Sequence, residues 1–276
     1  MQIKNFNDLI ENYDSFIFDI WGVVYDGVTP YPNTIETINL LLQRKDKEVV
    51  FLSNTPRPHD ITFKNLAGMG IDLKLEQVLT SGDIARNYLR SLDQKTKFYH
   101  LGKERNQDIL RDINNEIVDS IEEADLLLLS AFLDQGDDLN QYDDLLISAA
   151  KLGLKALCPN PDKEIMHGDA QRYCAGFFAQ KFENFGGTVK YIGKPHQEVY
   201  LNIFKQLKNK NLDRILMIGD TLETDILGAQ RANISSALTL TGNGRIFGAT
   251  DPSSAVEQAC SKLNIQLPTE IIWGVF

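Results

Sequence analysis

The sequence predicts an α/β protein in which a doubly wound parallel sheet is interrupted by a second α/β domain. Along the whole chain, short apolar runs alternate with segments whose apolar residues recur at helical spacing. Four of these runs end directly in polar residues, as expected at the carboxyl edge of a parallel sheet, where ligands bind. The stretch from residue 80 to residue 187 carries enough strands and helices for a core of its own.

The first unit begins with a short amphipathic helix predicted over residues 1–14. The apolar run 15–18 then predicts a buried strand, and helical spacing follows over 34–42. A second apolar run, 48–52, predicts the next strand, and a helix over 61–69 ends in a glycine-containing stretch.

The inserted unit starts near residue 80. Its helices are predicted at 83–92, 104–113, 139–152 and 171–185, and its strands at 97–101, 125–129 and 155–158. The first unit then resumes with strands at 188–192, 215–218 and 235–240 and helices at 198–207, 224–231 and 253–263. The predicted division is a core of residues 1–79 and 188–276, with an inserted domain of residues 80–187.

The composition excludes several classes of partner. A formal net charge of -10 at pH 7 argues against a surface for nucleic acid or anionic membrane, because both need clustered Lys and Arg. The most apolar run, 126–133, is far too short to span a bilayer. Three cysteines without metal-type spacing, and no recognisable signal peptide, predict a reducing cytoplasmic location.

The polar residues after the predicted strands suit phosphate chemistry. Asp19 can act as a nucleophile toward a phosphoryl group, and Asp19 with Asp220 suits Mg²⁺, which prefers oxygen ligands. Ser53 and Asn54 can donate hydrogen bonds to a phosphate. The remaining groups are Lys194, which supplies positive charge, and Asp225, which can hold a metal-bound water or orient Lys194.

Each of these residues also has a structural interpretation. Ser53-Asn54 can begin a turn, Lys194 can lie at a surface strand end, and Asp220 can cap the following helix. Four polar endings in this order on four apolar strands favour the functional interpretation.

The same four stretches resemble the motifs of the haloacid dehalogenase (HAD) superfamily of aspartate-nucleophile hydrolases. The matching segments are 18–23 (FDIWGV), 52–55 (LSNT), 193–195 (GKP) and 218–225 (IGDTLETD). The insertion, with Asn160-Pro161-Asp162 after a strand, resembles the α/β (C2-type) cap of class IIA members, the NagD-like and nitrophenylphosphatase-like phosphatases.

This resemblance implies a Rossmann-like core and a phosphatase acting on a small phosphorylated metabolite. It implies Asp19 as nucleophile, and Ser53 and Lys194 as the groups that hold the phosphoryl group. Mg²⁺ would be bound by Asp19, Asp220 and the backbone carbonyl of Trp21, with Asp225 as an indirect ligand. In the cap, the predicted substrate-contacting residues are Asn160, Asp162, His167 and Asp169.

One position departs from the family pattern. Family phosphatases usually carry a second aspartate two residues after the nucleophile, where it protonates the leaving group and activates water; this chain has Trp21 there. Three hypotheses follow: a slow phosphatase that uses another acid (Asp26, His167 or Asp169), a hydrolase for substrates with good leaving groups, or a protein that binds a phosphorylated metabolite without turnover. The sequence leaves a homodimer open.

Overall fold

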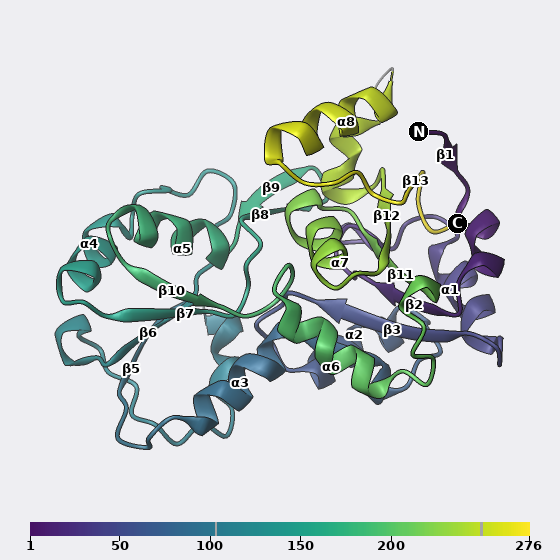
Figure 1. The fold of residues 1–276 in the computed structure, drawn as a ribbon. Helices are drawn as coiled ribbons and strands as arrows, with labels where there is room; N and C mark the ends of the chain where they lie inside the picture. Colours follow the sequence, from purple (N-terminus) through teal and green to yellow (C-terminus); the bar gives the residue numbers. More distant parts are fainter. Residues whose placement is uncertain (103, 249–250) are drawn as a thin grey trace.

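A computed structural model describes residues 1–102, 104–248 and 251–276 of the chain. The structure has two lobes side by side, and both termini lie at the core lobe (Figure 1). Within the described residues, the core sheet has seven parallel strands in the order β1-β13-β12-β11-β2-β3-β4. These strands are β1 Ile3–Lys4, β2 Ser15–Phe18, β3 Glu48–Ser53, β4 Val78–Thr80, β11 Ile215–Gly219, β12 Ser235–Thr239 and β13 Glu270–Ile272. The predicted α/β fold with a parallel core sheet is confirmed.

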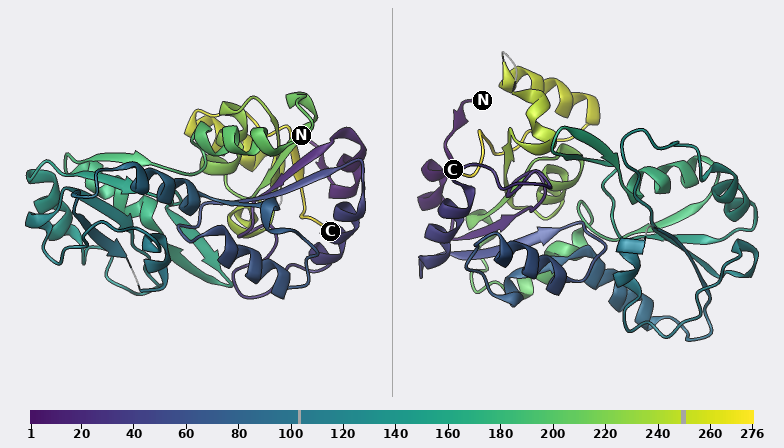
Figure 2. Two further views of the ribbon diagram at one scale, coloured as in Figure 1. Left: turned by 90° about the horizontal axis from the view of Figure 1, so that it is seen from below. Right: turned by 180° about the vertical axis from the view of Figure 1, so that it is seen from behind.

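The second lobe, here called the cap, contains a parallel sheet in the order β10-β7-β6-β5. Its strands are β5 Phe98–Gly102, β6 Leu126–Ser130, β7 Lys155–Cys158 and β10 Thr188–Tyr191. An antiparallel hairpin of β8 Glu164–His167 and β9 Ala170–Tyr173 lies between the two lobes (Figures 1 and 2).

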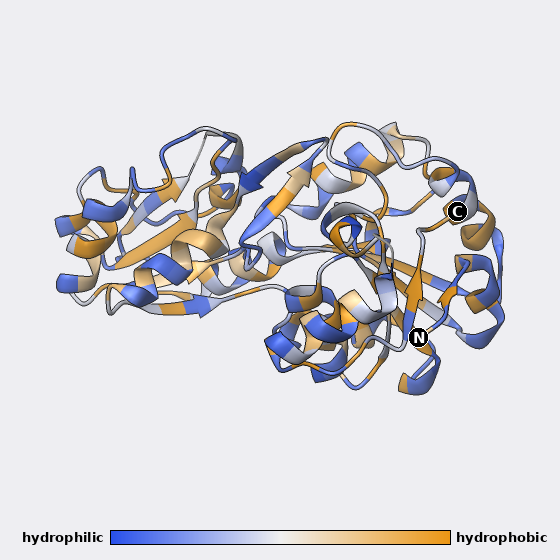
Figure 3. Ribbon diagram, turned by 90° about the horizontal axis from the view of Figure 1, so that it is seen from above, coloured by the Kyte–Doolittle hydropathy of each residue, from blue (hydrophilic) through white to orange (hydrophobic). Residues whose placement is uncertain are grey.

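Helices cover both faces of the core sheet because successive residues of a strand point to opposite sides. Phe16 and Phe18 of β2 pack with the helices of one face, and Ile17 packs with those of the other. Figure 3 shows hydrophobic residues gathered on the sheet strands. The α-helices are α1 Thr34–Gln43, α2 His59–Gly68, α3 Ser81–Ser91, α4 Asp143–Lys151, α5 Ala175–Asn184, α6 Gln197–Gln206, α7 Leu227–Arg231 and α8 Pro252–Leu263.

Shorter helical turns connect these elements. The 3₁₀ turns are η1 Phe6–Asn12, η2 Leu75–Gln77, η3 Glu104–Leu110, η4 Ile121–Glu123, η5 Leu212–Arg214 and η7 Gly242–Phe247, and η6 Leu222–Ile226 is a π-helix. The helices predicted over 1–14 and 104–113 are therefore shorter 3₁₀ turns, η1 and η3, rather than α-helices. Within the described residues, no helix is both long and apolar enough to cross a membrane.

Two predictions about the cap are corrected by the structure. The strand over 188–192 was expected to return to the core sheet, but β10 pairs with the edge of β7, and the chain crosses to the core only after it. The helix expected over 171–185 begins at Ala175, because the residues before it pair as β9 with β8. The division into a core and an inserted domain stays a prediction, since one buried cluster runs from the core sheet into the cap.

Candidate functional site

Three strand ends of the core sheet converge on one edge. Strand β2 lies between β3 and β11, with Phe18 in register with Phe51 on one side and Ile218 on the other. The next residue, Asp19, donates its backbone N–H to the carbonyl of Ile218, 2.8 Å away. Asp19, Asp220 and the strand-ending Ser53 therefore reach the same small pocket, as the parallel arrangement predicts.

Lys194 reaches Asp19 from the segment after the cap strand β10 rather than from a core strand. Its side chain is 1% exposed, and its Nζ lies 2.6 Å from Asp19 Oδ1 and 2.7 Å from Asp225 Oδ1. Burial alone would lower the pKa of Lys194, but the charges of Asp19 and Asp225 raise it above its ordinary value. The side chain is a fixed ammonium between two carboxylates.

Three carboxylates gather around this ammonium. Oxygens of Asp19, Asp220 and Asp225 lie within 4.8 Å of one another. Burial raises the pKa of Asp220 to about 7, and burial followed by the charge of Asp225 raises the pKa of Asp19. When all are ionised, three carboxylates and one ammonium leave a net charge of -2. A buried, oxygen-rich and negatively charged group of this kind fits a hard divalent cation.

Backbone and hydroxyl donors hold these carboxylates in place. Asp220 accepts hydrogen bonds from Thr221 Oγ1 at 2.9 Å and from the backbone N–H of Asn243 at 2.6 Å. Asp225 accepts one from the backbone N–H of Thr221 at 3.1 Å. Gly22 has φ +86°, and a Cβ on it would lie 2.0 Å from Asp220 Oδ2, so this position requires glycine. Thr221 and Asn243 were not predicted as site residues.

Asn54 connects the core to the cap. Its Oδ1 accepts the backbone N–H of Lys194 at 2.7 Å, and its Nδ2 donates to the Lys194 carbonyl at 3.1 Å and to Asp162 Oδ1 at 2.9 Å. The side chain is 2% exposed. Its amide therefore fixes the segment that carries Lys194, whereas donation to a phosphate stays a prediction.

Trp21 also joins the two lobes. Its indole Nε1–H donates to the carbonyl of Met166 in β8 at 2.6 Å, and its ring lies 5.7 Å from that of His167 and 5.2 Å from that of Tyr25. Trp21, at the position of the expected aspartate, thus fastens the hairpin over Asp19. No sequence pattern signals this contact, because the partner is 145 residues away.

The predicted cap residues lie in different places. Asp162 lines the pocket of Asp19, and burial raises its pKa to about 6. Asn160 accepts the backbone N–H of Asp162 at 3.0 Å and, like His167, lines a larger neighbouring cavity. Asp169 lies apart from both spaces, with an exposed side chain 3.5 Å from Arg245.

Two connected spaces lie between the lobes. The space at Asp19 has a volume of about 20 Å³, and the larger cavity has about 350 Å³. The two share Trp21, Ser53, Asp162 and Ile165 in their lining. The larger cavity is bounded by α2 on the core side and by the hairpin and the end of β6 on the cap side, so a molecule in it can reach Asp19 past Ser53.

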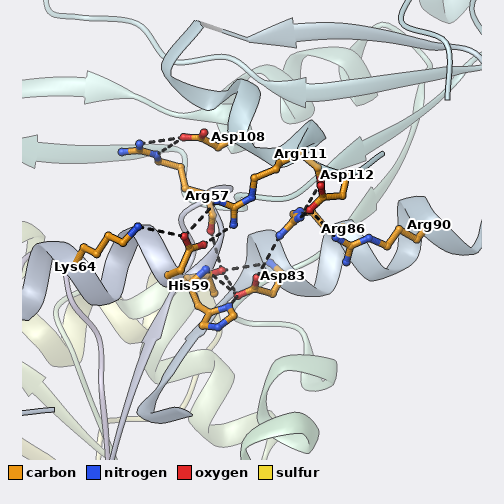
Figure 4. A network of polar contacts seen from close by, with 11 residues as sticks. Arg57, His59, Lys64, Asp83, Arg86, Arg90, Asp108, Arg111 and Asp112 are labelled. Atoms are coloured by element: carbon orange, nitrogen blue, oxygen red, sulfur yellow. Dashed lines mark hydrogen bonds and ion pairs between the residues drawn. The ribbon is translucent and has the colours of Figure 1, made fainter. Parts of the chain in front are cut away.

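A network of ion pairs joins α2 and the residues before it to η3 and the turn after it (Figure 4). Arg57 Nη2 lies 3.0 Å from Asp108 Oδ2, and Arg111 Nη2 lies 2.5 Å from Asp60 Oδ1. Arg57 and Asp60 belong to the core side and their partners to η3 and the turn after it. Exposed pairs of this kind contribute little stability singly, and several in one network contribute more.

Family comparisons match two separate stretches of the chain. The family of haloacid dehalogenase-like hydrolases matches residues 16–116, and a second HAD-hydrolase-like family matches residues 191–260. Among curated proteins, the chain is 26% identical to 4-nitrophenylphosphatase of Schizosaccharomyces pombe, over 87% of this chain and 87% of that protein. It is 25% identical to the sugar-phosphatase AraL of Bacillus subtilis, over 89% of each.

Solved structures show the same likeness. A haloacid dehalogenase-like family hydrolase from Brucella suis has a TM-score of 0.77 and 27% identity, covering 86% of this chain and 89% of that one. A structure described as a possible sugar phosphatase of the HAD superfamily from Cytophaga hutchinsonii has a TM-score of 0.80 and 21% identity, covering 100% of this chain and 98% of that one. The second likeness concerns the fold alone.

Proposed function

Because the chain belongs to the haloacid dehalogenase-like hydrolases, we propose that it is a Mg²⁺-dependent phosphatase that acts on a small phosphorylated metabolite through an aspartyl-phosphate. The observation that carries the proposal is the position of Lys194 Nζ, 2.6 Å from Asp19 and 2.7 Å from Asp225, beside the carboxylate of Asp220. This arrangement supports a site that combines a nucleophile, a fixed cation and metal-binding oxygens.

Asp19 is assigned as the nucleophile, with Lys194 and Ser53 holding the phosphoryl oxygens. Ser53 lines both connected spaces, and its Oγ accepts the backbone N–H of Thr55 at 3.2 Å, so its hydroxyl hydrogen can point to the phosphoryl group. Asp225 positions Lys194 through the 2.7 Å ion pair. Phosphoryl transfer depends mainly on such positioning and charge neutralisation.

The cation is proposed to be held by Asp19, Asp220 and the backbone carbonyl of Trp21. The three neighbouring carboxylates and their net negative charge support a divalent ion. When bound, Mg²⁺ supplies positive charge that offsets the repulsion between Asp19 and an anionic phosphate. Asp225 then acts indirectly, because Lys194 and the Thr221 N–H already occupy its oxygens.

The organic part of the substrate is proposed to lie in the cavity of about 350 Å³ between the lobes. Asn160 and His167 from the cap line this cavity, and Asp162 lies where it joins the pocket of Asp19. The names of the relatives, 4-nitrophenylphosphatase and sugar-phosphatase, support aryl and sugar phosphates as the first compounds to test. Turnover is proposed to be slow or specialised, because Trp21 replaces the general acid.

The test compares Mg²⁺-dependent hydrolysis of 4-nitrophenyl phosphate and acetyl phosphate by wild type and Asp19→Asn. The expected result is turnover that requires Mg²⁺ and disappears in Asp19→Asn. Equal turnover by the two proteins would remove Asp19 as nucleophile.

Trp21 favours a second candidate function, a protein that binds a phosphorylated metabolite without turning it over. Its indole lies where the general acid is expected and is bonded to Met166. Binding of phosphate and Mg²⁺ measured by calorimetry, together with no turnover of either compound, would support this alternative.

A further inference from the structure

The side chain of Trp21 takes no part in proton transfer at Asp19. Indole nitrogen is a donor only, and here its hydrogen is bonded to the Met166 carbonyl at 2.6 Å. It can neither protonate a leaving group nor take a proton from water.

Of the three substitutes that the sequence offers, His167 lines the larger cavity rather than the pocket of Asp19, and the other two, Asp26 and Asp169, are carboxylates with partners of their own. Asp26 Oδ1 accepts the backbone N–H groups of Val28 and Thr29, both at 2.8 Å. Partial burial raises the pKa of Asp26, but these hydrogen bonds outweigh it and the pKa lies below its ordinary value. Asp169 is exposed beside Arg245. Of the described carboxylates that line the pocket besides Asp19 and Asp220, Asp162 remains, and its Oδ1 is held by Asn54 at 2.9 Å.

The pocket over Asp19 also leaves little room for water. Its volume of about 20 Å³ is close to the minimum that one water needs. Trp21 and the hairpin residues Ile165 and Met166 form its apolar cover. A phosphoryl group on Asp19 would fill this space, so an attacking water would have to approach from the larger cavity, past Ser53 and Asp162, which line both spaces.

We infer that Asp19 becomes a long-lived aspartyl-phosphate: acyl phosphates phosphorylate the chain faster than water dephosphorylates it. The inference rests on the proposed function, and it adds a stable phosphorylated state of the protein. Two features slow the same step: Trp21 supplies no proton acceptor beside Asp19, and the space beside Asp19 has a volume of only about 20 Å³.

The chemistry of the two steps explains why phosphorylation of Asp19 is faster than hydrolysis of the aspartyl-phosphate. In the first step, an Asp19 oxygen attacks phosphorus, the bond from phosphorus to the acyl oxygen breaks, and a carboxylate leaves with the electron pair. That anion is stable and needs no proton. In the second step, water attacks phosphorus, the bond to the Asp19 oxygen breaks, and the water must lose a proton to a base.

The experiment incubates the full chain with Mg²⁺ and acetyl phosphate and measures its intact mass. The expected product carries one phosphoryl group, which peptide mapping places on Asp19 and which does not appear in Asp19→Asn. After removal of the donor, the rate of loss of this group gives its lifetime. Trp21→Asp, which restores a carboxylate, should shorten the lifetime by about 10²–10⁴-fold, the usual contribution of a general base.

Trp21→Phe is the matched control, because it removes the bond to Met166 without adding a base. Its phosphorylated form should outlive that of Trp21→Asp by at least about tenfold, since loss of the bond to Met166 supplies no proton acceptor. If Trp21→Asp does not fold, the wild-type measurement decides: steady hydrolysis of acetyl phosphate by a chain that stays unphosphorylated overturns the inference.

Asp162→Asn tests the remaining carboxylate. It keeps an oxygen for the bond from Asn54, so the lobes stay connected. An unchanged lifetime supports the inference, whereas a lifetime at least about tenfold longer would make Asp162 the base and overturn it. Absence of both phosphorylation and hydrolysis would instead reject the proposed function itself.

Discussion

Replacement of Asn54 by alanine should uncouple the cap from the core. The substitution removes three hydrogen bonds, two to the backbone of Lys194 and one to Asp162. At about 0.5–1.5 kcal/mol for each bond, the free energy of unfolding should fall by about 2–4 kcal/mol. The cost should lie toward the upper end, because the Lys194 N–H is then left buried without its acceptor.

Urea denaturation gives this free energy, and hydrolysis of 4-nitrophenyl phosphate reports the effect on the site. Asn39→Ala is the matched control: Asn39 also uses both ends of its amide, donating to the Gly70 carbonyl at 2.8 Å and accepting the Asp72 N–H at 2.8 Å, but it is remote from the pocket. It should cost about 1 kcal/mol or less and leave turnover unchanged, since water can replace both bonds at an accessible site. Equal destabilisation by the two variants would refute the assigned connection.

Three further predictions concern individual side chains. Gly22→Ala should lower the free energy of unfolding by about 1–3 kcal/mol, because the added Cβ would meet Asp220 at a positive φ. The same substitution should weaken Mg²⁺ binding measured by calorimetry, and unchanged binding would contradict this prediction. Lys194→Met should destabilise the chain by about 3–5 kcal/mol by leaving buried carboxylates unpaired, and added Mg²⁺ should restore part of the melting temperature in thermal scans. Burial lowers the pKa of His100 to about 4, so the unfolded chain binds a proton that the folded chain does not, and stability should fall between pH 6.5 and 4 by up to about 1.4 kcal/mol per unit. His100→Gln should remove this part of the pH dependence, which denaturation at several pH values would measure.

The central strands could be predicted from sequence because their signals are local. The buried runs that become β2, β3 and β11 are continuously apolar, and polar residues follow each of them directly. Asp19, Ser53 and Asp220 therefore followed from strand ends alone. Strands β1 and β13 could not be found this way: two or three residues carry no periodicity, and they pair with each other across nearly the whole chain.

The strand β10 shows a different limit. Its sequence predicts a strand correctly, but the choice between two sheets depends on which edge is open, and the edge of β7 is open beside it. Lys194 nevertheless reaches the site, because Asn54 fixes the segment after β10 through its backbone. Lys194 thus lies beside Asp19 as predicted, although the strand before it was assigned to the wrong sheet.

The hairpin of β8 and β9 lines the pocket of Asp19, but its sequence carries only a weak signal for strands. Its ten residues alternate poorly, and its turn at Gly168 has φ +58°, which is read from structure rather than from composition. The hairpin places Met166 over Trp21 and the pocket. The bond from Trp21 to Met166 therefore links the position of the expected aspartate in the core to the position of the hairpin in the cap.

With Trp21 at this position, the site keeps the charged groups that bind a phosphoryl group and a cation but has no proton acceptor there. The ammonium of Lys194 and the three carboxylates keep an arrangement suited to a phosphoryl group and a cation, and burying that net negative charge destabilises the chain unless a cation is bound. Trp21 leaves this electrostatic part intact, and its indole, bonded to the Met166 carbonyl in the lining of the Asp19 pocket, supplies no proton acceptor. Binding and formation of an aspartyl-phosphate need only the electrostatic part, whereas rapid release needs a base and a water. The step at which this chain should differ from a phosphatase with two aspartates is consequently the loss of the phosphoryl group.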